Sequence, residues 1–159
     1  MTLWEITLRL CAATFVGGAI GLNRDLHGKA TGVRTLGLVA LGSALIVLGV
    51  TDDAPNPTLD VNPLSRTVQG VLTGIGFLGA GVILHDVNSE HRIHGLTTAA
   101  VTWLTACVGL VCGIGNWRVL GIGVTLLFLL LTFGGTLERM FHRRSDQDGA
   151  VKPPIKPLE

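Results

Sequence analysis

Hydrophobic residues along this chain fall into five long runs separated by short polar segments. The runs cover Leu3–Leu22, Thr35–Val50, Thr67–Leu84, Leu96–Ile114 and Val119–Leu137. About 20 apolar residues in a helix cross the hydrocarbon core of a bilayer, and the second run is near the lower limit of that length. The pattern therefore predicts an all-α bundle of about five transmembrane helices.

The third run is rich in glycine and carries no charged residue. Glycine is a poor residue for the interior of a soluble helix, but in lipid small residues let helix backbones approach closely. These glycines cover more than one helix face, so we expect this helix to be central, with neighbours on two sides. The expected packing positions are Gly70, Gly74, Gly76, Gly79 and Gly81.

Two other runs carry small residues at helical spacing. They are Ala13, Gly17 and Gly21 in the first run, and Thr98, Thr102, Ala106, Gly109 and Gly113 in the fourth. Such a stripe favours close contact between helices. We expect the fourth run to pack against the glycine-rich third run.

The third run also contains the spacing G-x-G-x-x-G, at Gly74, Gly76 and Gly79. A dinucleotide site with this spacing needs a preceding strand and an acidic residue about 20 residues further on. The residues before Gly74 make a weak strand, and Asp86 and Glu90 come too early. The spacing therefore indicates helix packing rather than nucleotide binding.

Composition also favours a membrane protein. Of the 159 residues, 48% are hydrophobic and 14% are charged, whereas a soluble domain has roughly 25% charged residues. No strongly basic tract suggests a nucleic-acid partner. Residues 138–159 are basic and contain too little apolar surface to fold alone. We expect a five-span domain over residues 1–137 and a disordered cytoplasmic tail over 138–159.

The distribution of Lys and Arg predicts the orientation, because cytoplasmic loops carry the excess. Nine lie in the tail and in the loops after the first and third runs. Only Arg66 and Arg118 lie on the other side, with Arg9 inside the first run. We therefore place the N-terminus outside and the tail in the cytoplasm, with the first run as an uncleaved span.

Polar side chains in the loop after the third run include His85, Asp86, Glu90, His91 and His94. Imidazoles and carboxylates can bind a divalent metal. The spacing His-x-x-His differs from the i, i+4 pair of the zinc-protease helix, so a solvated loop is the simpler interpretation. No G-x-S-x-G motif occurs. We expect no enzyme activity, no metal site and no cofactor.

Charged residues at the ends of the first two runs are further candidates. Glu5 and Arg9 are four residues apart, which favours an ion pair on one helix face. Arg24, Asp25 and Arg34 flank the loop between the runs, where they can pair with one another, with lipid phosphate or with a partner protein. The cysteines Cys11, Cys107 and Cys112 fall in apolar runs, so we expect buried, unpaired thiols.

Three segments resemble the MgtC/SapB family of bacterial inner-membrane proteins. The first is G-L-N-R-D followed by K-A-T-G-V-R-T, within residues 21–35. The second is Arg66 followed by T-G-I-G-F-L-G-A-G-V-I at residues 73–83, and the third is H-G-L-T-T-A-A at residues 94–100 with Trp103. The order and spacing of these motifs are specific, and the resemblance covers roughly residues 10–118.

The resemblance implies a multi-span helical domain with a cytoplasmic C-terminus. It also implies a role in growth under magnesium limitation, through regulation of membrane partners such as the proton-translocating ATP synthase. By position, the functional residues it marks are Arg24, Asp25, Gly32, Arg34, Thr35, Arg66, Gly95, Thr97, Thr98 and Trp103.

The chain departs from the family in two places. Many members have a glutamate just before the first-loop arginine, where this chain has Asn23, and Asp25 is the candidate substitute. Virulence-associated members carry a folded cytoplasmic domain after the spans, whereas a short tail follows them here. Functions that reside in that domain are therefore not transferred to this chain by the resemblance.

The expected function is that of a self-associating inner-membrane regulator, which binds a membrane partner and tunes ion or proton homeostasis when magnesium is scarce. The alternative is a small transporter or channel for Mg²⁺ or another cation, because glycine-interrupted helices can expose carbonyls to ions. The runs carry no carboxylate at mid-depth, which weighs against a cation path.

Overall fold

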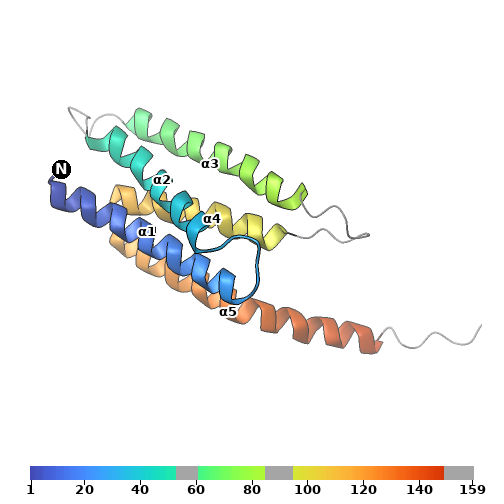
Figure 1. Ribbon diagram of the computed structural model, residues 1–159. Coiled ribbons are helices and arrows are strands. Elements are labelled where there is room, and N and C mark those ends of the chain that lie inside the picture. Colours follow the sequence, from blue (N-terminus) through green and yellow to red (C-terminus); the bar gives the residue numbers. More distant parts are fainter. Residues whose placement is uncertain (53–60, 85–94, 149–159) are drawn as a thin grey trace, which may run out of the picture. The chain divides into compact units, whose positions relative to one another are not determined.

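The computed structural model describes residues 1–52, 61–84 and 95–148, with side chains described for 1–51, 63–83 and 95–134. These residues form five helices, and each contains a stretch long and apolar enough to cross a membrane. The all-α, five-span prediction is confirmed. The helices are α1 (Leu3–Leu26), α2 (Val33–Asp52), α3 (Val61–Leu84), α4 (Leu96–Ile114) and α5 (Trp117–Asp148) (Figure 1).

Most helices extend beyond the apolar runs that predicted them. α1 continues through Leu26, which shortens the expected loop Asn23–Arg34 to six residues, 27–32. α3 includes Pro63 in its first turn, where the missing proline N–H costs no intrahelical bond. α5 continues to Asp148, so residues 138–148 are helical although the sequence predicts disorder from 138. The rest of that tail and the histidine-containing loop lie outside the described residues.

Residues 1–124 form one compact unit, and the rest of α5, from Thr125, falls into a second. Within the first unit, α2 and α4 each pack against three other helices, whereas α1 and α3 each pack mainly against these two. Figure 1 shows α3 running beside them. Of the membrane-spanning stretch of α4, 50% is buried within the protein, whereas the corresponding share in α3 is 6%. The centre of this unit is therefore α2 and α4.

Glycines on α4 and α1 explain this arrangement. A Cβ atom at Gly109 would overlap the carbonyl oxygen of Ala40, and one at Gly113 would lie 2.9 Å from that of Ala44. On α1, a Cβ at Gly17 would lie 2.6 Å from the Cβ of Ala40. The two small-residue stripes are thus packing faces, as expected, and their glycines face α2. The expected packing of α4 against α3 is also present. One fully buried cluster in this contact consists of Ala13, Ala40, Ala44 and Cys112.

The prediction that α3 is the central helix is wrong for the single chain. Among its glycines only Gly79 has a close neighbour, since a Cβ there would lie 3.6 Å from that of Ala99. A Cβ would meet nothing within 4 Å at Gly70, Gly74, Gly76 or Gly81. The glycines leave the backbone of α3 accessible, but no other helix of the described chain uses most of that surface.

The three cysteines are free thiols in different surroundings. Cys112 is buried, as expected, Cys107 is half-buried and Cys11 is exposed. The expectation of burial is therefore wrong for Cys11, because its face of α1 points away from α2 and α4.

A first test compares Gly109→Ala with Gly81→Ala. The new methyl group at position 109 meets backbone atoms of α2, so the helices must separate, and overpacking of this kind costs about 1–3 kcal/mol. At position 81 the space is open, and we expect the free energy of unfolding to stay the same or rise slightly. The measurement is SDS-induced unfolding in maltoside micelles, followed by circular dichroism. A larger loss at position 81 than at 109 would restore α3 as the packing centre.

Candidate functional site

Two arginines of α1 reach opposite ends of α4. Arg9 Nη1 donates to the carbonyl oxygen of Gly113 at 2.9 Å, and Arg24 Nη2 donates to Thr98 Oγ1. The two arginines are fifteen residues apart on α1. Their acceptor residues on α4, Thr98 and Gly113, are also fifteen residues apart. At 1.5 Å per residue both separations span about 22 Å, so the helices run antiparallel with matched ends.

Arg9 lies where a cation is favourable. The last carbonyls of a helix carry a partial negative charge. Gly115, the residue after the end of α4, has φ +82°, and a Cβ there would lie 2.7 Å from Cζ of Arg9. Glu5 and Arg9 attract each other electrostatically, as expected, but Arg9 gives its hydrogen bond to Gly113. The Glu5 carboxylate accepts hydrogen bonds from the backbone and the hydroxyl of Thr2, closing a capping box at the start of α1.

Arg24 lies where a cation is unfavourable. It is 4% exposed, and its Thr98 contact is at the N-terminal end of α4, which carries a partial positive charge. Its Nε is buried without a hydrogen-bond partner, and no carboxylate in the described part of the chain pairs with it. A guanidinium stays protonated in proteins. Arg24 is therefore a buried charge without a described counter-charge.

Asp25, the nearest carboxylate in sequence, serves another contact. Its Oδ2 accepts the N–H of Val33, the first residue of α2, at 2.9 Å. Gly32 lies against this carboxylate, because a Cβ at that position would overlap it. The preceding residue, Thr31, is buried with an unpaired hydroxyl. Asp25 thus caps α2 and shapes the turn between α1 and α2.

All three motifs of the sequence meet near this end of the bundle. The first supplies Arg24, Asp25 and Gly32, and the third supplies Thr98 and Gly95. Gly95 has φ +88°, and a Cβ there would lie 3.0 Å from the carbonyl oxygen of Val82 in the second motif. Arg34, Thr35 and Thr97 lie exposed at the starts of α2 and α4. Arg66 on α3 and Trp103 on α4 are exposed, and within the described residues no hydrogen bond joins them to this group.

Sequence reasoning missed the contact between Arg9 and the end of α4. The signal was present, because Thr2-x-x-Glu5 is a capping-box pattern that engages the carboxylate otherwise expected to pair with Arg9. An arginine released from that pair is free to bind backbone carbonyls. A short sequence window does not reveal which helix supplies them.

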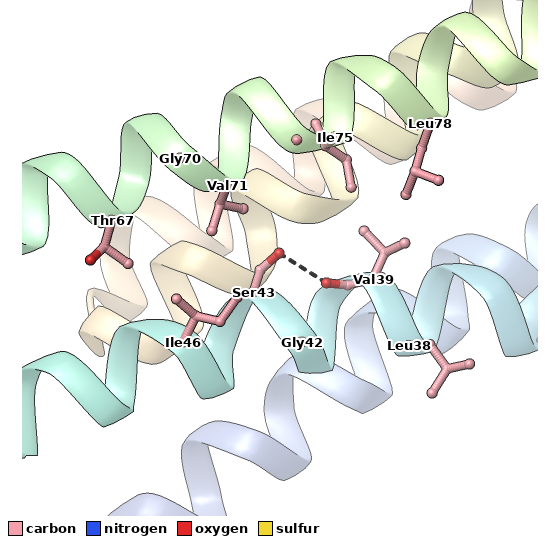
Figure 2. A pocket seen from close by; sticks show the side chains of 11 residues that line it. Leu38, Val39, Gly42, Ser43, Ile46, Thr67, Gly70, Val71, Ile75 and Leu78 are labelled. Atoms are coloured by element: carbon pink, nitrogen blue, oxygen red, sulfur yellow. Dashed lines mark hydrogen bonds between the residues drawn. The ribbon is translucent and has the colours of Figure 1, made fainter.

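An open groove of about 670 Å³ lies between α2 and α3 (Figure 2). Apolar side chains and glycine backbone line it, and the Ser43 hydroxyl in its wall donates to the Val39 carbonyl at 2.9 Å. The groove therefore offers an apolar surface without charge. Its lining residues are Leu38, Val39, Gly42, Ser43, Ile46, Thr67, Gly70, Val71, Gly74, Ile75 and Leu78.

Metal-binding groups are not gathered in the described residues. Within these residues no three His, Cys, Asp or Glu side chains come together as ligands. The loop with His85, Asp86, Glu90, His91 and His94, which the sequence offered as an alternative metal site, lies outside them.

Five apolar helices, with polar contacts gathered at their ends, define a multi-pass α-helical membrane protein. The chain belongs to the MgtC family, whose model matches residues 10–140. No solved structure gives a significant match.

Three relatives illustrate this similarity. The chain is 46% identical to Protein SrpB of Synechococcus elongatus, over 96% of this chain and 87% of that protein. It is 41% identical to the putative magnesium transporter YhiD of Escherichia coli K12, over 80% of this chain and 59% of YhiD. It is 35% identical to Protein MgtC of Salmonella typhimurium LT2, over 74% of this chain and 47% of that protein. The matched region is thus about half of MgtC.

A double-mutant cycle tests the turn between α1 and α2. Asp25→Ala removes a side-chain cap of α2, which costs about 0.5–2 kcal/mol. Gly32→Ala pushes the same carboxylate away, so we expect a similar loss of unfolding free energy. Because both changes remove one interaction, the double variant should lose little more than either single variant. Fully additive losses in SDS-induced unfolding would show that Gly32 does not act through Asp25.

Proposed function

We propose that this protein regulates ion or proton homeostasis under magnesium limitation, from the bacterial inner membrane, by binding another membrane protein. Membership of the MgtC family and the word magnesium in the name of YhiD support the link to this ion. The matched region covers only part of YhiD and MgtC, so the proposal concerns the membrane helices that the chain shares with them.

The groove between α2 and α3 supports the binding of a partner. In lipid the hydrophobic effect does not draw helices together, and small residues permit the close approach that replaces it. Gly70 and Gly74 are four residues apart on α3, and Gly42 lies in the opposite wall. A Cβ at any of these glycines would meet nothing within 4 Å. A partner helix that enters the groove gains backbone contact on both walls.

Two partners fit this proposal. One is a second copy of the chain, which would make a homo-oligomer through α3. The other is a helix of a membrane complex such as the ATP synthase, which the family resemblance suggests. Both present apolar transmembrane helices, and the groove has no charged residue that would oppose either.

The alternative function is a small transporter of Mg²⁺ or another cation, and the name of YhiD favours it. Mg²⁺ sheds its water reluctantly and needs oxygen ligands in octahedral geometry. Ser43 and Thr67 are the hydroxyl residues of the groove lining, and each hydroxyl donates to its own helix backbone. This lining favours a helix over a hydrated ion, so we place the transporter second.

The proposed orientation, with the N-terminus outside, rests on the excess of Lys and Arg in the segments assigned to the cytoplasm. Single cysteines at Ala30 and Ser65, both exposed, test it in a chain whose native cysteines are replaced by alanine. We expect an impermeant maleimide to label Ser65→Cys on intact cells and Ala30→Cys only after permeabilisation. Labelling of Ala30→Cys but not Ser65→Cys on intact cells would show the opposite orientation, with the N-terminus in the cytoplasm.

The regulator and transporter proposals separate in a paired experiment. We expect purified protein in liposomes to pass neither Mg²⁺ nor protons above the rate of empty liposomes under an imposed potential. From magnesium-starved cells, the tagged protein should co-purify a specific membrane complex. Gly74→Leu should reduce that yield at least tenfold, because the leucine fills the groove.

Gly123→Leu is the matched control, since a Cβ at Gly123 also meets nothing within 4 Å but lies on α5. We expect it to retain the partner at the yield of the unchanged chain. Flux that Arg34→Ala abolishes would favour the transporter. If Gly74→Leu retained the partner, the groove would not be the surface that binds it.

A further inference from the structure

The two ends of α4 differ in their charge balance. At the C-terminal end, Arg9 complements the partial negative charge of the last carbonyls. At the N-terminal end, Arg24 adds a full positive charge to the partial positive charge of the helix. No carboxylate of the described residues pairs with Arg24. Within the described residues, this end of α4 therefore has no anion that balances Arg24.

Unused hydrogen-bond donors gather at the same place. The first intrahelical bond of α4 runs from the N–H of Ala99 to the carbonyl of Gly95 at 2.8 Å. The N–H groups of residues 96, 97 and 98 consequently have no acceptor within this 19-residue helix, and no side chain caps it. Buried Nε of Arg24 is another donor without a partner, and Nη2 of the same guanidinium touches Thr98 in the first turn.

Helix N-termini and arginine side chains are both binding groups for oxyanions. Backbone N–H groups point out of the first turn, and the planar guanidinium donates two parallel hydrogen bonds to a phosphate. The guanidinium cannot lose its proton, and the described residues offer it no carboxylate, so a bound anion would balance its charge. We propose that Arg24 and the N-terminal turn of α4 bind a phosphate group.

Two sources can supply this phosphate. Arg24 lies two residues before the last residue of α1, at the depth where a membrane span meets the lipid headgroups. A lipid headgroup is one source, and free phosphate in the adjoining aqueous phase is the other. This site is separate from the groove between α2 and α3, so the proposal does not rest on the regulatory function.

The test uses the full chain, purified in maltoside micelles free of lipid and phosphate. One arm titrates inorganic phosphate against gluconate at constant ionic strength. The other arm adds dioleoylphosphatidylglycerol, with dioleoylglycerol as the control that lacks the headgroup. The readout is the midpoint of thermal unfolding, which rises when a ligand binds the folded state alone.

We expect a saturable rise in at least one arm. A rise with inorganic phosphate identifies a site for the free ion, and a rise with the phospholipid alone identifies a headgroup site. Arg24→Gln should raise the half-saturating concentration at least tenfold. Arg9→Gln removes an arginine from the other end of α4, so it should keep the half-saturating concentration of the unchanged chain.

The absence of a saturable rise in both arms would overturn the proposal, and so would equal responses of Arg24→Gln and the unchanged chain. If Arg24→Gln does not fold, Arg24→Lys takes its place. Lysine keeps the charge but lacks the fork of donors, so the half-saturating concentration should again rise at least tenfold. An unchanged value for Arg24→Lys would mean that charge alone accounts for the effect and that the bidentate site is absent.

Discussion

Close backbone contact of α2 with α1 and α4 is the constraint on which the rest of the structure depends. Ala40 lies at the centre of this contact, since its carbonyl faces Gly109 and its methyl group faces Gly17. In a bilayer, apolar side chains gain little by leaving lipid for protein, so helices associate where backbones can approach. A larger residue at any of these three positions would separate α2 from a neighbour.

Within this packing, two of the buried threonines of α4 serve its own backbone. The hydroxyls of Thr102 and Thr105 donate to carbonyls one turn earlier, at 2.9 and 2.8 Å. Such bonds satisfy polar groups where water is absent. They also leave few oxygens for an ion to use along this face. Arg24 differs, because its Nε is buried and unpaired, and so the unsatisfied chemistry of the described chain lies at the end of the bundle and not along its middle.

Hydropathy predicts the five helices because the length of an apolar run is a local property that the bilayer imposes. It does not predict where α1 and α5 end, since polar residues such as Asn23 and Arg24 continue a helix once it has formed. The motifs identify Arg24, Asp25, Gly32 and Thr98, but their separate tasks emerge only from the fold. The spacing of residues in the motif does not reveal that Asp25 caps α2 instead of pairing with Arg24.

The glycines of α3 show the limit of sequence reasoning most clearly. Small-residue spacing reveals that a backbone is accessible, and it does so equally for Gly109 and Gly74. Whether a second helix uses that access depends on chain topology and, for a membrane protein, on other chains. Gly109 meets α2, whereas Gly74 meets nothing within 4 Å and opens into the groove.

A nitroxide scan of α3 measures this difference most directly. Single spin labels at successive positions from Thr67 to Leu78, in nanodiscs holding one chain each, report collision with dissolved oxygen. We expect accessibility to vary with a period of 3.6 residues, low at Ile75, which is 8% exposed, and high at Phe77, which is 82% exposed. Uniformly low accessibility along α3 would contradict it and would make α3 the central helix.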